Sequence, residues 1–183
     1  MAVPAALDPP AVIPAPPAEV RALAAVQRAT NDTPLVGIAR GMSKFGEHAA
    51  GWLVLGAIGA VVDRRRRRQW LAATAGVAAA HGASVAVKRV VRRPRPDHPD
   101  VVVHCGTPSR LSFPSAHATS TTAAAVLFGS LLRRTGGGVA AALLVPPMAL
   151  SRLVLGVHYP TDVVAGSVLG AAVAAAARRW ERR

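Results

Sequence analysis

The sequence predicts an all-α membrane protein, a polytopic helical bundle of about five transmembrane helices preceded by an N-terminal amphipathic or re-entrant helix. Two observations support this fold class. The 183 residues are 51% hydrophobic although the formal net charge is +13, and charged and apolar residues are segregated along the chain. A soluble domain would spread its charge more evenly, and a disordered chain would lack the apolar content. The uncharged runs, separated by groups of arginine, are 49–62, 69–87, 111–132, 135–151 and 163–177.

The first 44 residues precede the predicted spans. Residues 1–17 contain six prolines and no apolar run long enough for the core of a signal peptide, so they are predicted to be a disordered tail. Residues 18–44 are predicted to form an amphipathic helix, because apolar residues recur at helical spacing. Such a helix lies in the membrane interface, and Asp32 and Pro34 are expected to interrupt it. Residues 45–183 form the predicted transmembrane domain.

The uncharged runs differ in whether they are long enough to span a bilayer. A helix that crosses the hydrocarbon core needs about 20 residues, with roughly 17 as a minimum. Runs 69–87, 111–132 and 135–151 meet this length. Runs 49–62 and 163–177 are shorter, but flanking residues with apolar stems and polar tips can extend them to the interface.

Small residues dominate these spans. Gly166 and Gly170 lie one helical turn apart, and small residues at this spacing let helix backbones approach closely. We expect this pair to serve packing within the bundle rather than a dimer interface.

The orientation follows from the basic residues at the two ends of the spans. One face carries eleven arginines in short loops or the tail and is therefore predicted to be cytoplasmic. The other face still carries seven basic residues, which indicates a negatively charged ligand on the extracytoplasmic side of the plasma membrane. The first group is Arg64 to Arg68, Arg133, Arg134, Arg178, Arg179, Arg182 and Arg183. The second group is Lys88, Arg89, Arg92, Arg93, Arg95, Arg110 and Arg152.

Other ligand classes are disfavoured. Aromatic residues make up only 4% of the chain and the basic runs sit at the ends of apolar segments, which argues against a nucleic-acid partner. The single cysteine, Cys105, excludes an intramolecular disulfide and multi-cysteine metal sites. A cluster near it is interpreted as a solvated loop rather than a metal site. Its members are Asp97, His98, Asp100, His104 and Cys105.

Three polar segments are expected at the outer ends of the spans. Two prolines stop the helix before Arg95 and turn its guanidinium away from the helix axis. Ser115 is a good helix N-cap, and a helix start with free N–H groups binds anions. Pro160 suits the first turn of another helix. The segments are 88–96, 114–117 and 151–162.

Together these segments carry the groups that phosphoryl transfer needs. Lysine and arginine side chains hold phosphate oxygens, and two histidines can attack phosphorus and protonate the departing oxygen. Asp162 can orient His158 and stabilise its charged form, so His158 is the predicted nucleophile and His117 the predicted general acid. This chemistry requires no metal or other cofactor. An isolated histidine is more often structural, but the complete set favours catalysis.

Three motifs of this chain together resemble the three-part signature of the type 2 phosphatidic acid phosphatase (PAP2) superfamily. They are Lys88-x6-Arg95-Pro96, Pro114-Ser115-Ala116-His117 and Ser151-Arg152-x5-His158-x3-Asp162. The resemblance implies a phosphohistidine on His158, proton donation by His117 and orientation by Asp162. It also implies phosphate binding by Lys88, Arg95, Ser115, Ala116 and Arg152. The sequence departs from the family in having Ala116 where glycine is usual, and about five spans instead of six.

A site at the membrane surface reaches lipid headgroups, so the expected substrate is a lipid-linked phosphate. Residues 108–120 and 146–150 resemble small actinobacterial members of the family, which implies removal of the 5-phosphate from a polyprenyl-linked ribose in cell-wall arabinan synthesis. Undecaprenyl diphosphate, phosphatidylglycerophosphate and phosphatidic acid stay open as substrates. A different class of function also stays open, a non-catalytic protein that binds anionic lipid. The possible partners are a second copy of the chain and an enzyme of the same pathway.

Three further polar residues lie near the predicted spans. His81 falls within a span, where we expect a hydrogen bond between helices. Glu47 and His48 lie near the outer end of the first span and are given no assigned role, with capping favoured over chemistry.

Overall fold

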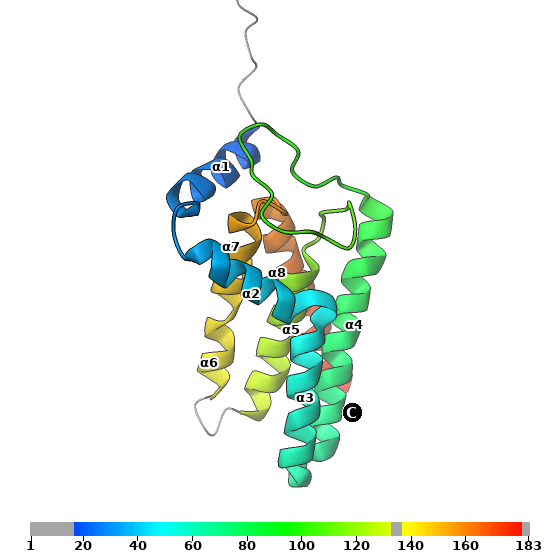
Figure 1. Cartoon of the computed structure of the whole chain (residues 1–183). Helices are drawn as coiled ribbons and strands as arrows, with labels where there is room; N and C mark the ends of the chain where they lie inside the picture. Colours follow the sequence, from blue (N-terminus) through cyan, green and yellow to red (C-terminus); the bar gives the residue numbers. More distant parts are fainter. Residues whose placement is uncertain (1–16, 133–136, 181–183) are drawn as a thin grey trace, which may run out of the picture.

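The computed structural model describes residues 17–132 and 137–180, and the regular elements within these ranges are helices. Part of the predicted tail, residues 1–16, lies outside the described residues, as do Arg133, Arg134, Arg182 and Arg183. The predicted all-α membrane bundle is confirmed (Figure 1). The elements are α1 Ala18–Thr30, α2 Leu35–Gly46, η1 Glu47–Ala49, α3 Ala50–Val62, η2 Arg64–Arg66, α4 Arg67–Val91, α5 Ala116–Leu131, α6 Gly137–Leu143, α7 Val145–Val154 and α8 Pro160–Trp180.

Four stretches are long and apolar enough to cross a membrane: Leu35–Val62, Arg64–Val91, Gly137–Val154 and Pro160–Trp180. α5 corresponds to the third predicted span, 111–132. It has 16 residues and packs against α4, α6 and α8 at the centre of the bundle, where most of its side chains are buried.

The helix boundaries differ from the prediction at three places. Predicted span 135–151 is made of two helices, α6 and α7, with Leu144 between them. The helix of predicted span 111–132 begins only at Ala116, because the preceding residues run to the N-cap of α5. The predicted helix over 18–44 is two helices, α1 and α2, and residues 31–34 separate them as Asp32 and Pro34 led us to expect. α2 also joins the apolar stretch that contains α3.

Aromatic and small side chains share the core between α3, α4 and α5. The rings of Trp70 and Phe128 lie 5.4 Å apart, and Trp52 donates through Nε1 to Thr121 Oγ1 at 3.1 Å. Large apolar side chains on the outward faces are exposed, as lipid contact would require. They include Val54, Ile58, Val61, Leu71, Val164 and Val168.

α8 lies directly against α5. A Cβ on Gly166 would come within 2.5 Å of the Ser115 carbonyl oxygen, and one on Gly170 would overlap the Thr119 carbonyl oxygen. The expectation that these glycines serve internal packing is confirmed. Their close approach places the start of α8 beside the start of α5.

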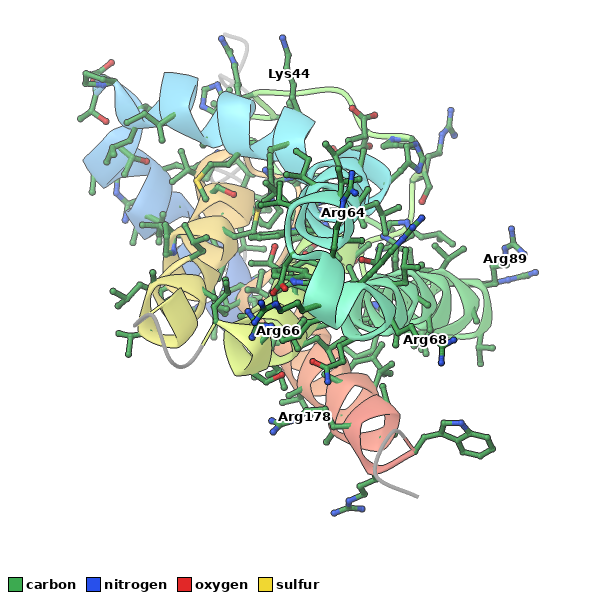
Figure 2. The ribbon with its side chains drawn as sticks, turned by 90° about the horizontal axis from the view of Figure 1, so that it is seen from below. Lys44, Arg64, Arg66, Arg68, Arg89 and Arg178 are labelled. Atoms are coloured by element: carbon green, nitrogen blue, oxygen red, sulfur yellow. The ribbon has the colours of Figure 1, made fainter. Side chains whose placement is uncertain are left out.

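Basic residues gather around the start of α4, at the end of the bundle seen from below in Figure 2. Arg66 pairs with Asp63 at 2.6 Å and donates to the Leu131 carbonyl oxygen at the end of α5 at 2.5 Å. At the other end of α4, the irregular segment 92–115 crosses the top of the bundle in Figure 1, beside α1.

Candidate active site

The first motif lies where α4 ends. The helix stops at Val91, and Arg92 takes a left-handed backbone conformation with φ 53°. Lys88, only 8% exposed, donates from Nζ to three carbonyl oxygens of the segment leading to α5. These belong to Leu111 at 3.3 Å, Ser112 at 2.9 Å and Pro114 at 2.7 Å. The ammonium group therefore holds this segment in place, a role that the motif alone did not predict.

The second motif begins α5. Ser115 Oγ accepts from the Ala118 N–H at 3.4 Å, as expected of an N-cap, and the Ser115 N–H donates to the Asp162 carbonyl oxygen at 2.9 Å. Ala116 is the first helical residue, so this position does not require a left-handed backbone and tolerates alanine. His117 Nε2 lies 3.0 Å from the Ser43 carbonyl oxygen on α2. Because a carbonyl oxygen can only accept, Nε2 carries a hydrogen.

The third motif joins α7 to α8. Pro160 starts α8, which places the fully buried Asp162 in its first turn. Asp162 Oδ2 accepts from the Tyr159 N–H at 2.9 Å and lies 3.4 Å from His158 Nδ1. No hydrogen bond forms over this second distance, since His158 Nδ1 is buried without a hydrogen-bond partner among the described residues, so the pairing is mainly electrostatic.

Arg95 and Asp162 hold the imidazole of His158 from its two sides. Arg95 Nη1 lies 3.2 Å from His158 Nε2. A guanidinium only donates, so Nε2 must accept and the hydrogen of the neutral ring sits on Nδ1, facing Asp162. Burial lowers the pKa of His158 to about 3, although its interaction with Asp162 works in the other direction. At neutral pH the ring is therefore neutral, and its one basic nitrogen is Nε2, whose lone pair accepts from Arg95 in this structure and is the atom that a nucleophilic reaction would use.

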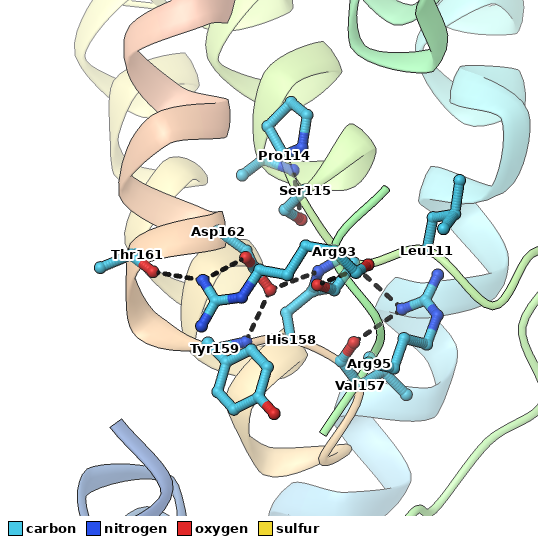
Figure 3. A network of polar contacts seen from close by, with 12 residues as sticks. Arg93, Arg95, Leu111, Pro114, Ser115, Val157, His158, Tyr159, Thr161 and Asp162 are labelled. Carbon is cyan, nitrogen blue, oxygen red and sulfur yellow. Dashed lines mark hydrogen bonds and ion pairs between the residues drawn. The ribbon is translucent and has the colours of Figure 1, made fainter. Parts of the chain in front are cut away.

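The backbone around the site positions Arg95. Its guanidinium donates to the Val157 carbonyl oxygen at 2.7 Å, beside His158 (Figure 3). It also donates to the Ser109 carbonyl oxygen at 2.9 Å. Arg95 thus connects the end of the first motif to the turn that carries His158.

Arg93 also contacts the third motif, although no individual role was predicted for it. It donates from Nη1 to Thr161 Oγ1 at 2.8 Å and to Asp162 Oδ1 at 3.0 Å (Figure 3). Its Nη2 pairs with Glu19 of α1 at 2.5 Å, and its guanidinium lies 4.1 Å from the Tyr159 ring centroid. Burial works to raise the pKa of Glu19, but hydrogen bonds from Thr161 and Arg93 outweigh it and lower the pKa.

Arg152 is 2% exposed. It donates from Nε to Ser151 Oγ and from Nη1 to Ser43 Oγ, both at 3.1 Å. Its Nη2 is buried without a hydrogen-bond partner among the described residues. Burying an unpaired charged donor is costly, and an anion would satisfy it.

A cavity of about 110 Å³ collects residues from all three motifs. Of the predicted site residues, those that line it are Lys88, Arg95, Ala116, His117 and His158. Ser115, Arg152 and Asp162 are not in its lining. Ser115 directly precedes Ala116, and Asp162 pairs with His158. Arg152 contacts Ser43, which also contacts His117. Two imidazoles and two cationic side chains therefore face one small volume, which suits phosphate binding and transfer.

The cavity has a further wall. Glu47, His48 and His81 line it, and the rings of the two histidines lie 6.2 Å apart. The predicted capping role of Glu47 and His48 is wrong, because neither η1 nor α3 has a side-chain cap. The predicted interhelical hydrogen bond of His81 is also wrong, since neither ring nitrogen is hydrogen-bonded within the described part of the chain and Nδ1 is buried there. Its position in the middle of a span was the one signal of a functional location.

The loop cluster predicted to be solvated lies away from this lining. His104 Nε2 lies 2.9 Å from Asn31 Oδ1, and His98 Nδ1 lies 3.7 Å from Asp100 Oδ2. Among residues 17–132 and 137–180 no group of three His, Cys, Asp or Glu residues is arranged to hold a metal ion.

The helices and the cavity define a polytopic membrane protein with a cationic site in which the two histidines of the second and third motifs face one cavity. Residues 69–183 match the PAP2 superfamily model, and the chain belongs to this superfamily, as its three motifs predicted. A decaprenylphosphoryl-5-phosphoribose phosphatase of Mycobacterium tuberculosis is 57% identical over 162 residues, covering 88% of this chain and 89% of the relative. One of Mycolicibacterium smegmatis is 63% identical over 154 residues, covering 83% of each chain.

Two solved structures share the fold. The first transmembrane PAP2-type phosphatidylglycerolphosphate phosphatase from Bacillus subtilis has a TM-score of 0.72 at 20% identity, covering 88% of this chain and 85% of that structure. Aquifex aeolicus LpxE has a TM-score of 0.65 at 18% identity, covering 87% of this chain and 94% of that structure. The family and the named relatives confirm the predicted class of enzyme, a phosphatase that acts on phosphoric monoesters.

Proposed function

We propose that this chain converts decaprenylphosphoryl-5-phosphoribose to decaprenylphosphoryl-ribose, a step in the synthesis of cell-wall arabinan precursors. The 57–63% identity to the mycobacterial relatives supports this choice of substrate. The observation that carries the chemistry is the neutral His158, held between Arg95 and Asp162 in the cavity that also contains His117.

In the proposed reaction, His158 Nε2 attacks the phosphorus and the bond from phosphorus to the ribose 5-oxygen breaks. The electron pair of this bond stays on the ribose oxygen, which takes the Nδ1 proton of a doubly protonated His117, since the Nε2 hydrogen donates to Ser43. Water then attacks the phosphohistidine, His117 accepts the proton of the water, and inorganic phosphate leaves. Asp162 stabilises the positive charge that develops on His158.

Cationic and polar groups around the cavity would bind the phosphoryl oxygens during both steps. Arg95 and the unpaired Nη2 of Arg152 are the side-chain donors best suited to this, and the start of α5 supplies backbone N–H groups. Lys88 contributes positive charge while it holds the segment before Ser115. The proposed phosphate-binding set is Lys88, Arg95, Ser115, Ala116 and Arg152.

A second cavity supports a lipid substrate. It measures about 430 Å³ and is lined by apolar residues of α2, α3 and α7 and by Leu144, which precedes α7. Met148 lines it and meets His117 across Gly46, since a Cβ on Gly46 would lie 3.3 Å from Met148 Cε and 2.5 Å from His117 Cδ2. We place the polyprenyl chain here, on the side of the proposed general acid. The lining residues are Gly41, Met42, Phe45, Trp52, Leu55, Leu144 and Met148.

We further propose that the active site faces the extracytoplasmic side of the plasma membrane. Arg64 to Arg68 lie at the start of α4 and Lys88 and Arg95 at or beyond its other end, so the arginine-rich loop and the site lie on opposite membrane faces. With Cys105 replaced by serine, Asp100→Cys should react with an impermeant maleimide from outside and Gln69→Cys should not. The reverse labelling pattern would overturn this orientation. Association with a second copy or a pathway enzyme stays a prediction, which size determination in detergent tests.

The enzymatic proposal is tested by phosphate release from phosphoribosyl decaprenyl phosphate by detergent-solubilised protein in the presence of EDTA. His158→Asn and His117→Asn should each lose at least about 100-fold in rate, and His98→Asn, in the outer loop, should match the wild type. An alkaline quench with substrate labelled at the phosphate should leave label on the wild type but not on His158→Asn. Equal release by His158→Asn and the wild type would contradict the mechanism, and binding without release would favour the non-catalytic lipid-binding alternative.

The choice of substrate needs its own measurement. A panel containing undecaprenyl diphosphate, phosphatidylglycerophosphate and phosphatidic acid should give kcat/KM values well below that of the phosphoribosyl lipid. Similar values throughout would contradict the narrow substrate proposal while leaving the chemistry of the site intact.

A further inference from the structure

The wall formed by Glu47, His48 and His81 has no part in phosphoryl transfer as proposed above. All three side chains nevertheless line the same cavity as His117 and His158. They come from η1 and the middle of α4, so two separate helical segments contribute to this wall.

The backbone of η1 is strained where it supplies this wall. His48 has φ 50° and the following Ala49 has φ 60°, so two consecutive non-glycine residues occupy the left-handed region. Such conformations persist when the surrounding structure enforces them, and they concentrate at functional sites. Here the strained turn connects α2 to α3 immediately after Gly46, whose backbone packs against the ring of His117. The turn therefore lies beside the proposed proton donor to the leaving group.

The chemistry of the wall does not suit a phosphate. The carboxylate of Glu47 only accepts hydrogen bonds and would repel phosphate oxygens, which also accept. A hydroxyl group is a suitable partner, because it can donate to Glu47 and both donate to and accept from an imidazole. His81 Nδ1 adds a buried polar atom that has no partner among the described residues, and buried polar atoms are normally hydrogen-bonded.

We infer that Glu47, His48 and His81 form a sub-site that binds the hydroxyl groups of the sugar carrying the reactive phosphate. This inference deepens the proposed function and rests on it for the pentose as the ligand. The sub-site would let the protein distinguish a phosphorylated sugar from a phosphate ester whose remaining part is only hydrocarbon. It would also position the sugar so that its 5-oxygen lies between the two catalytic histidines.

The test is equilibrium binding of two soluble probes, ribose 5-phosphate and n-butyl phosphate, to the full chain in detergent. Every variant carries His158→Asn to prevent turnover, and calorimetry gives the two dissociation constants. The parent should bind ribose 5-phosphate about tenfold or more tightly than n-butyl phosphate. Glu47→Ala should reduce this ratio by about tenfold, the typical effect of losing a hydrogen bond to a charged group.

A second variant and a matched control complete the experiment. His48→Asn should also reduce the ratio of the two dissociation constants, and asparagine tolerates the left-handed backbone at this position. Asp100→Ala removes the same charge from the outer loop, where the side chain is 58% exposed, and should keep the ratio of the parent. Correctly folded variants are identified by an unchanged elution profile. A ratio near one in the parent, or an unchanged ratio in both Glu47→Ala and His48→Asn, would overturn the inference.

These outcomes are separable from those of the proposed function. If the wild type fails to release phosphate from the phosphoribosyl lipid but the parent prefers ribose 5-phosphate through Glu47, the proposed substrate falls and the sugar sub-site stands. If the lipid is hydrolysed and Glu47→Ala keeps the ratio of the parent, the proposed function stands and the sub-site falls.

Discussion

Arg93 donates to the buried Oδ1 of Asp162 at 3.0 Å, so the carboxylate that faces His158 is itself held by a cation from the first motif. The same guanidinium reaches Glu19 on α1, 74 residues earlier in the chain. A connected path of ion pairs thus runs from the N-terminal helix through Arg93 and Asp162 to the proposed nucleophile. This path gives α1 a part in positioning the site.

Replacing Arg93 should therefore impair the reaction without removing a group that contacts the substrate. We expect Arg93→Ala to lower kcat by about 10- to 100-fold with little change in KM, because a small misplacement of a reactive group has effects of this size. Steady-state phosphate release measures both constants. Arg92→Ala, which removes the adjacent exposed arginine, should behave as the wild type. A rise in KM at constant kcat would instead mean that Arg93 binds substrate.

The buried neutral His158 should make the fold sensitive to acid. Burial lowers the pKa of His158 to about 3, whereas an unfolded histidine titrates near 6.5. Between these values the unfolded chain binds a proton that the folded chain does not, so stability falls as the pH falls from 6.5 towards 3. The free energy of unfolding falls by at most about 1.4 kcal/mol per pH unit, which amounts to a loss on the order of 2 kcal/mol between pH 6.5 and 5.

Melting temperatures in detergent at pH 7.5 and pH 5 test this prediction. The drop should be smaller for His158→Asn than for the wild type, while His98→Asn should show the full drop. An identical drop in all three proteins would mean that the protonation of His158 does not limit stability in acid.

The contact between α8 and α5 leaves no room for a side chain at Gly170. Gly170→Ala should lower the free energy of unfolding by about 1–3 kcal/mol, the usual range for an overpacked interface. Gly82→Ala on α4 is the matched control, because a Cβ there would meet nothing within 4 Å. It should be neutral or stabilise the protein by up to about 1 kcal/mol through helix propensity. Denaturation in detergent distinguishes the two variants, and equal stability would contradict the close packing of these helices.

The apolar cavity beside α2 gives a prediction about the lipid chain. A Cβ at Gly41 would meet no atom within 4 Å, so Gly41→Phe should fold and place its ring in the cavity. We expect kcat/KM for a long-chain phosphoribosyl lipid to fall about tenfold or more, while hydrolysis of a short-chain analogue changes little. Gly37→Phe, one turn earlier on α2 and outside the cavity lining, provides the control. An equal loss on both chain lengths would place the lipid chain elsewhere.

Much of the site could be predicted because its signals are local. Ser115 caps α5 and Pro160 opens α8 as their residue types suggest, and both choices depend on a few neighbouring residues. The roles of individual cations were harder to foresee. Lys88 belongs to a phosphate-binding motif, yet its ammonium group is occupied by three carbonyl oxygens some 23 to 26 residues away.

Local patterns of residues were enough to predict the helical membrane fold, the approximate spans and the residues of the three motifs. They were enough because hydrophobic run length and turn chemistry act over short stretches of chain. The tertiary structure alone decided that Glu19 and Arg93 support Asp162, and that Glu47, His48 and His81 form a wall of the cavity. Those relationships depend on how helices pack side by side, and no local pattern encodes which distant side chains then meet.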